Sequence, residues 1–267
     1  MTWLIPAIGV PAAVLCAYVP TRVKGNMRAA LLLKTTLSVM FILYALYGVL
    51  RLATSTSFAS MTSFNAFINF ESLTFGLFVV AGLVFGLLGD IWLDLKDIHL
   101  KSKEHYMFCG FNSFLIGHLF FMSGLFIAFS GTWKSVLLAI ACGAVVAFFI
   151  FLTEKPMKLD YGKFRFISIV YAFILATAVA FPIILALPAF SPAEFGGAVV
   201  EIFGTTLRKV PLIFGLGMVS FILSDLFLSN IYFRTDGKTP PPTMFWCNYI
   251  FYYGAQFTLA CSLYFLV

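Results

Sequence analysis

Charged residues are scarce in this chain of 267 residues: they make up 10% of the sequence, whereas hydrophobic residues make up 61%. A mean hydropathy of +1.00 excludes an ordinary water-soluble domain. The net charge of +6 is small, and the basic residues fall in short clusters between apolar segments, which excludes a nucleic-acid-binding surface. The composition therefore indicates a polytopic membrane protein.

The motifs of common metal and hydrolase sites are also missing. The five cysteines lie in or beside apolar segments, and no two of them have the CxxC spacing of zinc or redox sites. The chain has no GxSxG, HExxH or P-loop sequence. Only His118 of the three histidines falls within an apolar segment, whereas a membrane-embedded zinc hydrolase needs two or three. We therefore expect no metal and no cofactor.

Eight apolar segments are long enough to cross a bilayer, for which about 17 to 25 residues suffice. Backbone groups in lipid must be satisfied within the segment, which predicts an all-α, single integral membrane domain over residues 1–267. The first segment lacks the basic start of a cleaved signal peptide, so it is expected to remain as a helix. The segments 51–72 and 189–206 are expected to be long loops. The predicted helices cover about residues 2–19, 29–50, 73–95, 106–130, 133–153, 165–188, 210–232 and 244–266.

Basic residues alternate between the predicted loops. Twelve of the 17 Lys and Arg residues lie in the first, third, fifth and seventh loops, among them Arg22 in the first. Cytosolic loops are enriched in Lys and Arg, so these loops are expected to face the cytosol and both termini the opposite side. The endoplasmic reticulum and the plasma membrane fit this orientation equally well.

Two pairs of segments indicate an internal duplication. GLVFGLLGDIWL from Gly82 resembles GMVSFILSDLFL from Gly217, and GHLFFMSGLF from Gly117 resembles AQFTLACSLY from Ala255. Four helices separate the two copies, and this even number predicts a parallel repeat of two four-helix halves.

Polar side chains within the predicted helices concentrate in the cytosolic half. Asp90 lies about five residues, and Asp225 about seven, from the cytosolic ends of their helices. An acid near the centre of a membrane helix costs about 2.5 to 3.5 kcal/mol, so these two are the strongest candidates for a functional role. The pattern predicts a polar cavity that opens to the cytosol. The other polar residues at such depths are Lys34, His118, Tyr171, Tyr252, Tyr253 and Gln256.

Structural roles remain open for several of these residues. Lys34 is the only cation well inside a predicted helix, and it can pair with an acid or extend to the interface. His118 can bond a neighbouring helix, and the tyrosines can be packing residues. Asp94 and Asp97 share a helix face with Asp90, but they lie near enough to the expected interface to be solvated.

The sequences around these residues resemble the YhhN-like lysoplasmalogenase family of eight-helix membrane proteins. The resemblance is carried, in chain order, by GLLGDIWLDL, FCGFNSFLIGHLFFM, SDLFLS and YYGAQFTLACSLYF, and the segments around Lys34 and Tyr171 are also similar. It implies hydrolysis of the vinyl-ether bond of a lysoplasmalogen to a fatty aldehyde and glycerophosphoethanolamine or glycerophosphocholine. It also favours the endoplasmic reticulum.

A vinyl ether hydrolyses when an acid protonates its β-carbon and water captures the resulting cation, which calls for a protonated carboxyl and a carboxylate. Asp90 and Asp225 suit these catalytic roles in either order. The expected partners are the lysophospholipid and the bilayer, and the oligomeric state is open. The expected substrate-binding residues are Lys34, Asp94, His118, Tyr171, Tyr252, Tyr253 and Gln256.

Two other functional classes fit the same features. A proton-coupled transporter would also use a parallel repeat and buried acids, and it would need a continuous polar path to the outer face. A non-catalytic lipid-binding or scaffold protein is the second alternative.

Overall fold

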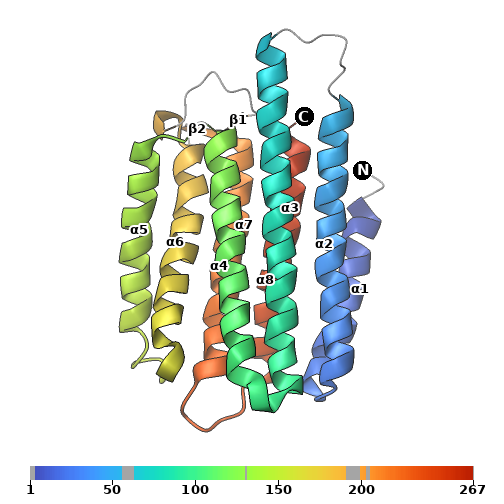
Figure 1. The fold of residues 1–267 in the computed structure, drawn as a ribbon, viewed down its shortest axis with the longest axis vertical. Helices are drawn as coiled ribbons and strands as arrows, with labels where there is room; N and C mark the ends of the chain where they lie inside the picture. Colours follow the sequence, from blue (N-terminus) through green and yellow to red (C-terminus); the bar gives the residue numbers. More distant parts are fainter. Residues whose placement is uncertain (1–3, 56–62, 130, 191–198, 203–204, 267) are drawn as a thin grey trace.

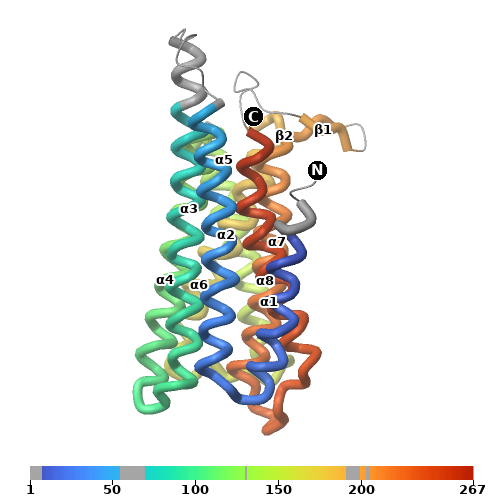
Figure 2. The backbone as a smooth tube through the Cα atoms, turned by 90° about the vertical axis from the view of Figure 1, so that its right-hand side faces the viewer, coloured from blue at the N-terminus to red at the C-terminus, as the bar shows by residue number. Residues whose placement is uncertain are grey.

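The structure is a computed structural model that describes residues 4–55, 63–129, 131–190, 199–202 and 205–266. This part of the chain forms eight α-helices that run along one long axis (Figure 1 and Figure 2). The helices are α1 (Leu4–Val23), α2 (Met27–Ser55), α3 (Ser63–Ile98), α4 (Lys103–Ala128), α5 (Trp133–Leu152), α6 (Arg165–Ala186), α7 (Lys209–Phe233) and α8 (Pro242–Ser262).

The helices are those of an integral membrane protein. Within the described residues, six helices, α2 to α7, are long and apolar enough to cross a membrane. In α1 the stretch whose side chains are described, Ile8–Val23, is apolar but shorter than these six, and α8 carries Asn248, Gln256 and several tyrosines that lower its hydropathy. The start of α1 and the end of α8 lie at the same end of the bundle (Figure 1), which we call the outer end. The count of eight spans and the orientation stay predictions.

Most helices begin and end within about five residues of their predicted limits, and two differences bear on the site and the loops. α3 begins at Ser63, about ten residues earlier than expected, and it extends beyond its neighbours in Figure 1. α1 continues to Val23, which moves Arg22 from the predicted first loop into a helix. A helix satisfies its own backbone, so it does not have to stop where the apolar run stops. The prediction of one long loop over 51–72 is therefore wrong, although residues 56–62 lie outside the described part.

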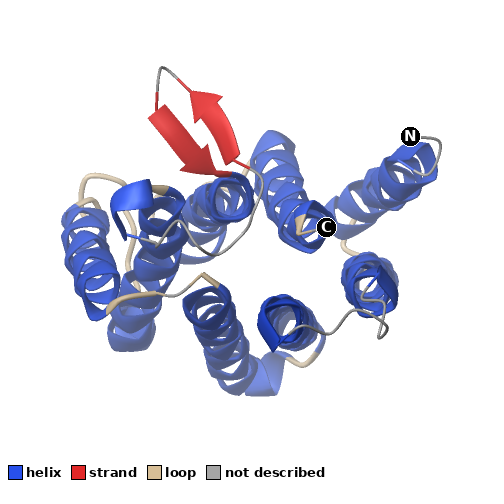
Figure 3. Cartoon of the chain, turned by 90° about the horizontal axis from the view of Figure 1, so that it is seen from above, coloured by secondary structure: helices blue, strands red, loops and turns tan. Residues whose placement is uncertain are grey.

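A small hairpin lies between α6 and α7 at the outer end, at the edge of the helical bundle (Figure 3). Strands β1 (Val199–Ile202) and β2 (Thr205–Arg208) pair in antiparallel register, with Val199 opposite Arg208. The hairpin was not predicted, since the sequence indicates only a long loop at 189–206, and residues 191–198 and 203–204 lie outside the described part. All the other regular elements of the described chain are helices, as predicted.

The helices pack in a closed order. Consecutive helices contact each other from α1 to α4 and from α5 to α8, and the contacts of α4 with α6 and of α2 with α8 close the arrangement. α5 packs mainly against α6 and lies outside this ring. If each of the first four helices is matched with its counterpart in the last four, the contact of α4 with α6 corresponds to the contact of α8 with α2. This is the pattern that the predicted parallel repeat requires, and the repeat itself stays a prediction.

Glycines hold α3 and α4 close together. A Cβ on Gly117 would lie 3.0 Å from the backbone carbonyl oxygen of Gly82, and a Cβ on Gly110 would lie 2.7 Å from the side chain of Leu93. Small residues permit such close approach between membrane helices. The contact fixes α3, which carries the acidic residues, against α4.

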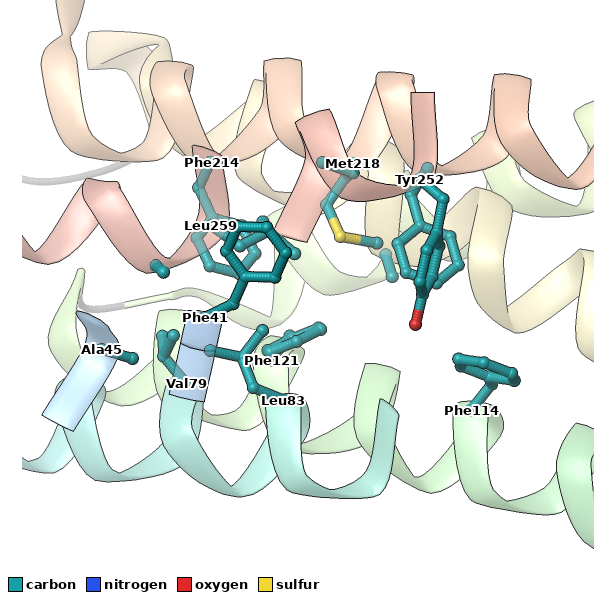
Figure 4. Close-up of a cluster of buried hydrophobic side chains, with 14 of the residues drawn as sticks. Phe41, Ala45, Val79, Leu83, Phe114, Phe121, Phe214, Met218, Tyr252 and Leu259 are labelled. Atoms are coloured by element: carbon teal, nitrogen blue, oxygen red, sulfur yellow. The ribbon is translucent and has the colours of Figure 1, made fainter. Parts of the chain in front are cut away.

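The outer half of the interior is filled by apolar side chains. Figure 4 shows part of this core, where α2, α3, α4, α7 and α8 meet. Its members include Phe41, Val79, Phe121, Phe214, Met218 and Leu259, all of them buried. Tyr252 lies in the same cluster, and its hydroxyl leads from the apolar core to the polar site described next.

Candidate active site

Three acids on one face of α3 meet three cations. Lys34 of α2 lies 3.2 Å from a carboxyl oxygen of Asp90 and 3.4 Å from one of Asp94. Arg22 of α1 lies 3.3 Å from Asp94 and also pairs with Asp97. The third cation, Lys96, donates to both oxygens of Asp97, at 2.7 and 2.8 Å. With all six side chains ionised, the three negative and three positive charges of this cluster cancel.

Both carboxyl oxygens of Asp90 have polar partners. Its Oδ2 accepts hydrogen bonds from the Ser38 hydroxyl at 2.6 Å and from the Tyr252 hydroxyl at 2.8 Å, while Oδ1 faces Lys34. Its side chain is 2% exposed. A buried carboxylate is tolerated when it is paired and hydrogen-bonded, and these contacts meet both conditions.

Asp225 of α7 has different surroundings. It accepts a hydrogen bond from the Tyr171 hydroxyl at 2.5 Å, and His118 Nε2 lies 3.5 Å from that same hydroxyl. Asp225 is partly exposed, and no Lys, Arg or His side chain within the described ranges forms an ion pair with it. The two acids predicted to be catalytic therefore differ in charge environment: one has a cation and the other has only a phenol.

Asp90 and Asp225 line one cavity of about 90 Å³. Lys34, Tyr171 and Tyr252 also line it, and their contacts fix both carboxyl groups from α2, α6 and α8. Seven of the eight helices contribute to the wall. At the roughly 30 Å³ that a water molecule occupies in the liquid, the space can hold about three waters, which is enough for water and a small reacting group.

On the side away from the outer end, this cavity is bordered by the segment between α5 and α6. Tyr161 of that segment lines the cavity and packs on Phe233 with ring centroids 4.7 Å apart. Leu159 and Phe164 join them in a small apolar cluster, and the backbone N–H of Asp160 donates to the carbonyl of Phe233. Aromatic packing therefore lies where the sequence analysis predicted an opening to the cytosol, and that opening stays a prediction.

A model of the YhhN family matches residues 29–263. The chain belongs to the YhhN family. This membership makes a lysoplasmalogenase-like hydrolase its coarse functional class. No curated protein and no solved structure gives a match to the chain. The YhhN match includes the cavity and both acids, whereas Arg22 lies before it.

Most of the residues predicted for the site lie around this one cavity. Lys34, Asp90, Tyr171, Asp225 and Tyr252 line the cavity. The pairing of Lys34 with an acid is confirmed, and its extension to the interface is wrong because the residue is buried.

Four predicted residues lie behind the cavity wall. His118 is buried and reaches the site only through Tyr171. Tyr253 stacks on Phe41 with ring centroids 5.8 Å apart, and Gln256 is buried on the same helix. The expectation that Asp94 is solvated is wrong, because Arg22 and Lys34 cover it and leave it 0% exposed. The side chain of Asp97, at 20% exposure, keeps partial contact with solvent.

Arg22 and Ser38 belong to the polar cluster but were not predicted from the sequence. Arg22 was assigned to a loop because the apolar run ends before it. It lies four residues after Tyr18, on the same face of a helix, and this spacing was the signal available in the sequence. Ser38 lies one turn after Lys34 on α2, so it shares the face of Lys34, but nothing in the sequence distinguishes it from a packing serine.

Proposed function

We propose that this protein hydrolyses the vinyl-ether bond of lysoplasmalogens and releases a fatty aldehyde with glycerophosphoethanolamine or glycerophosphocholine. The observation that carries the proposal is the pair of aspartates in one membrane-embedded cavity, one beside Lys34 and the other beside a tyrosine hydroxyl. Acid-catalysed cleavage through an oxocarbenium ion needs two carboxyl groups in unequal states.

The charge balance supports Asp225 as the proton donor. Arg22, Lys34 and Lys96 offset the three acids of α3, so an ionised Asp225 would add a negative charge without a cation. A carboxyl group in that situation takes up a proton more readily than one with an ammonium group at 3.2 Å. Asp225 is also the more accessible of the two carboxyl groups.

The reaction then proceeds in three steps. Asp225 gives its proton to the β-carbon of the vinyl ether, and the cation that forms lies next to the carboxylate left behind, with the charge of Asp90 nearby. Water adds to this cation and returns a proton to Asp225, which is thereby restored. In the third step the hemiacetal breaks its bond to the glycerol oxygen, which takes up a proton while the hemiacetal hydroxyl loses one, and aldehyde and alcohol leave.

Apolar packing in the outer half supports hydrolysis over transport. A transporter needs a polar path to both faces, whereas Phe121, Phe214 and Met218 fill the described interior on the outer side of the acids. We further propose the endoplasmic reticulum as the location, with both termini on the non-cytosolic side, as loop charge indicates.

Aldehyde release by the purified protein tests this function. The wild-type protein in detergent or liposomes should convert lysoplasmalogen to aldehyde, and Asp225→Asn should lower the rate by about 10² to 10⁴, the usual contribution of a general acid. Asp160→Asn, which changes an exposed acid between α5 and α6, is the matched control and should keep full activity. The proposal fails if the wild-type protein releases no aldehyde, or if Asp90→Asn and Asp225→Asn both remain fully active.

A further inference from the structure

The cavity continues beyond the helix ring towards the side of the protein. Past Asp225 it is lined by Ile169 and Ala172 of α6, Ile222 of α7, and Ala147 and Ile150 of α5. α5 lies outside the ring, so a cavity that reaches α5 extends beyond it. The face of α6 that meets both α4 and α5, with Phe173 and Thr177, lines a different cavity, which leaves the gap between α6 and α7 as the passage. Ile169 is 40% exposed, and a cavity wall with that exposure reaches the lateral surface of the bundle.

This lateral opening has defined limits. Towards the outer end, α6 and α7 are in close contact, since a Cβ on Gly215 would lie 2.9 Å from the side chain of Ile183. Towards the other end, Tyr161 and Phe233 pack together beneath the cavity. Between these two contacts lies an apolar window in the part of the bundle that faces hydrocarbon in a membrane.

We infer that the alkenyl chain of the substrate passes through this window, with its first carbons inside the cavity and the remainder in the bilayer. The inference rests on the proposed function and adds the path of the chain. The vinyl ether of a lysoplasmalogen joins an apolar chain to a polar glycerol. Asp225 likewise lies between the apolar lining on α5, α6 and α7 and the polar lining that includes Lys34, Ser224 and Asn248.

The cost of burying a charged group and the size of the cavity both favour the alkenyl chain over the headgroup as the group in the window. A phosphate or ammonium headgroup placed among Ala147, Ile150 and Ile222 would lose hydration without a partner, whereas a hydrocarbon chain loses nothing there. The enclosed volume of about 90 Å³ is far below the 300 to 1,000 Å³, roughly, that enclose a whole small ligand. Most of a long chain therefore stays outside the cavity, in lipid.

A bulky residue in the window provides the test. Ala172→Trp should lower kcat/KM for a long-chain lysoplasmalogen by about tenfold or more, as steric changes in apolar pockets do. It should change hydrolysis of a water-soluble glyceryl vinyl ether, which has no chain beyond the double bond, by no more than about twofold. The control is Ala144→Trp on the exposed face of α5, outside the cavity lining, which should leave both rates unchanged. An equal loss on both substrates, or no loss on either, overturns the inference.

Photo-crosslinking of the wild-type protein gives a second readout that needs no substitution. A lysoplasmalogen analogue with a diazirine a few carbons along its chain should label peptides from α6 and α7 that contain residues 169–172 or 222–226. Labelling confined to α2 and α8 would overturn the proposed path. If the wild-type protein releases no aldehyde from either substrate, the proposed function fails, and the position of the crosslink still reports whether a chain lies in the window.

Discussion

Removal of Lys34 tests the charge balance on which the assignment of the two acids rests. Lys34 is buried and lies 3.2 Å from Asp90 and 3.4 Å from Asp94. At an effective dielectric constant of about 20, a charge pair at the shorter distance attracts by about 5 kcal/mol before desolvation is counted. Lys34→Met leaves three acids with two cations, and breaking a buried pair in this way destabilises a protein by about 3 to 5 kcal/mol.

A second substitution separates charge imbalance from lost packing. Asp90→Asn in the Lys34→Met background restores the balance, because Arg22 and Lys96 then face Asp94 and Asp97. Asparagine keeps an acceptor oxygen for the hydroxyls that bond Asp90. We expect the double variant to regain about 1 to 3 kcal/mol relative to the sum of the single variants, the usual range for residues in one network.

Thermal unfolding in detergent measures these effects. At about 2 to 4 °C per kcal/mol, Lys34→Met should lower Tm by about 6 to 20 °C, and the double variant should recover part of this loss. Lys134→Met changes an exposed lysine at the start of α5, outside any buried pair, and should leave Tm within about 1 °C. If the double variant loses as much Tm as the two single variants together, Lys34 and Asp90 are not coupled and the charge argument is refuted.

Two further predictions concern Tyr171 and the glycine contact. Tyr171→Phe removes the donor to Asp225, so kcat should fall by about tenfold or more at a similar KM, and an unchanged kcat in the aldehyde assay would contradict this role. Gly117→Ala places a methyl group 3.0 Å from the carbonyl oxygen of Gly82, so the protein should lose about 1 to 3 kcal/mol of stability. Gly9→Ala, whose added methyl group meets no atom within 4 Å, is its control, and equal Tm values for these two variants would contradict the packing argument.

The sequence predicted the helices better than their ends. Hydropathy detects the residues that lipid tolerates, and this signal located all eight helices of the described chain. It does not detect helix that continues into water or into the protein, so the early start of α3 at Ser63 and the last turn of α1 were missed. The hairpin was missed because its strands, Val199–Ile202 and Thr205–Arg208, are four residues long each, which is too short to stand out in hydropathy.

For the site, the sequence predicted which ionisable side chains lie within the membrane, but not which side chains from other helices pack against them. Asp90, Asp225 and Lys34 stood out because ionisable side chains are expensive in lipid, and all three line the cavity. Helical spacing placed Asp94 on the face of Asp90, yet its burial depends on Arg22, which comes from a helix more than 70 residues earlier. Spacing along one helix gives the face of a residue, whereas the partner opposite that face follows only from packing.

The two halves of the chain place two similar acids in different surroundings, as the proposed reaction requires. Asp90 on α3 contacts Lys34 from the preceding helix, and Asp225 on α7 contacts Tyr171 from the preceding helix. In the predicted parallel repeat these would be corresponding positions, and such a duplication would supply two carboxyl groups that face one cavity. Identical surroundings would give both acids the same tendency to ionise, and vinyl-ether hydrolysis needs one acid of each kind. A lysine in one half and a tyrosine in the other provide that difference.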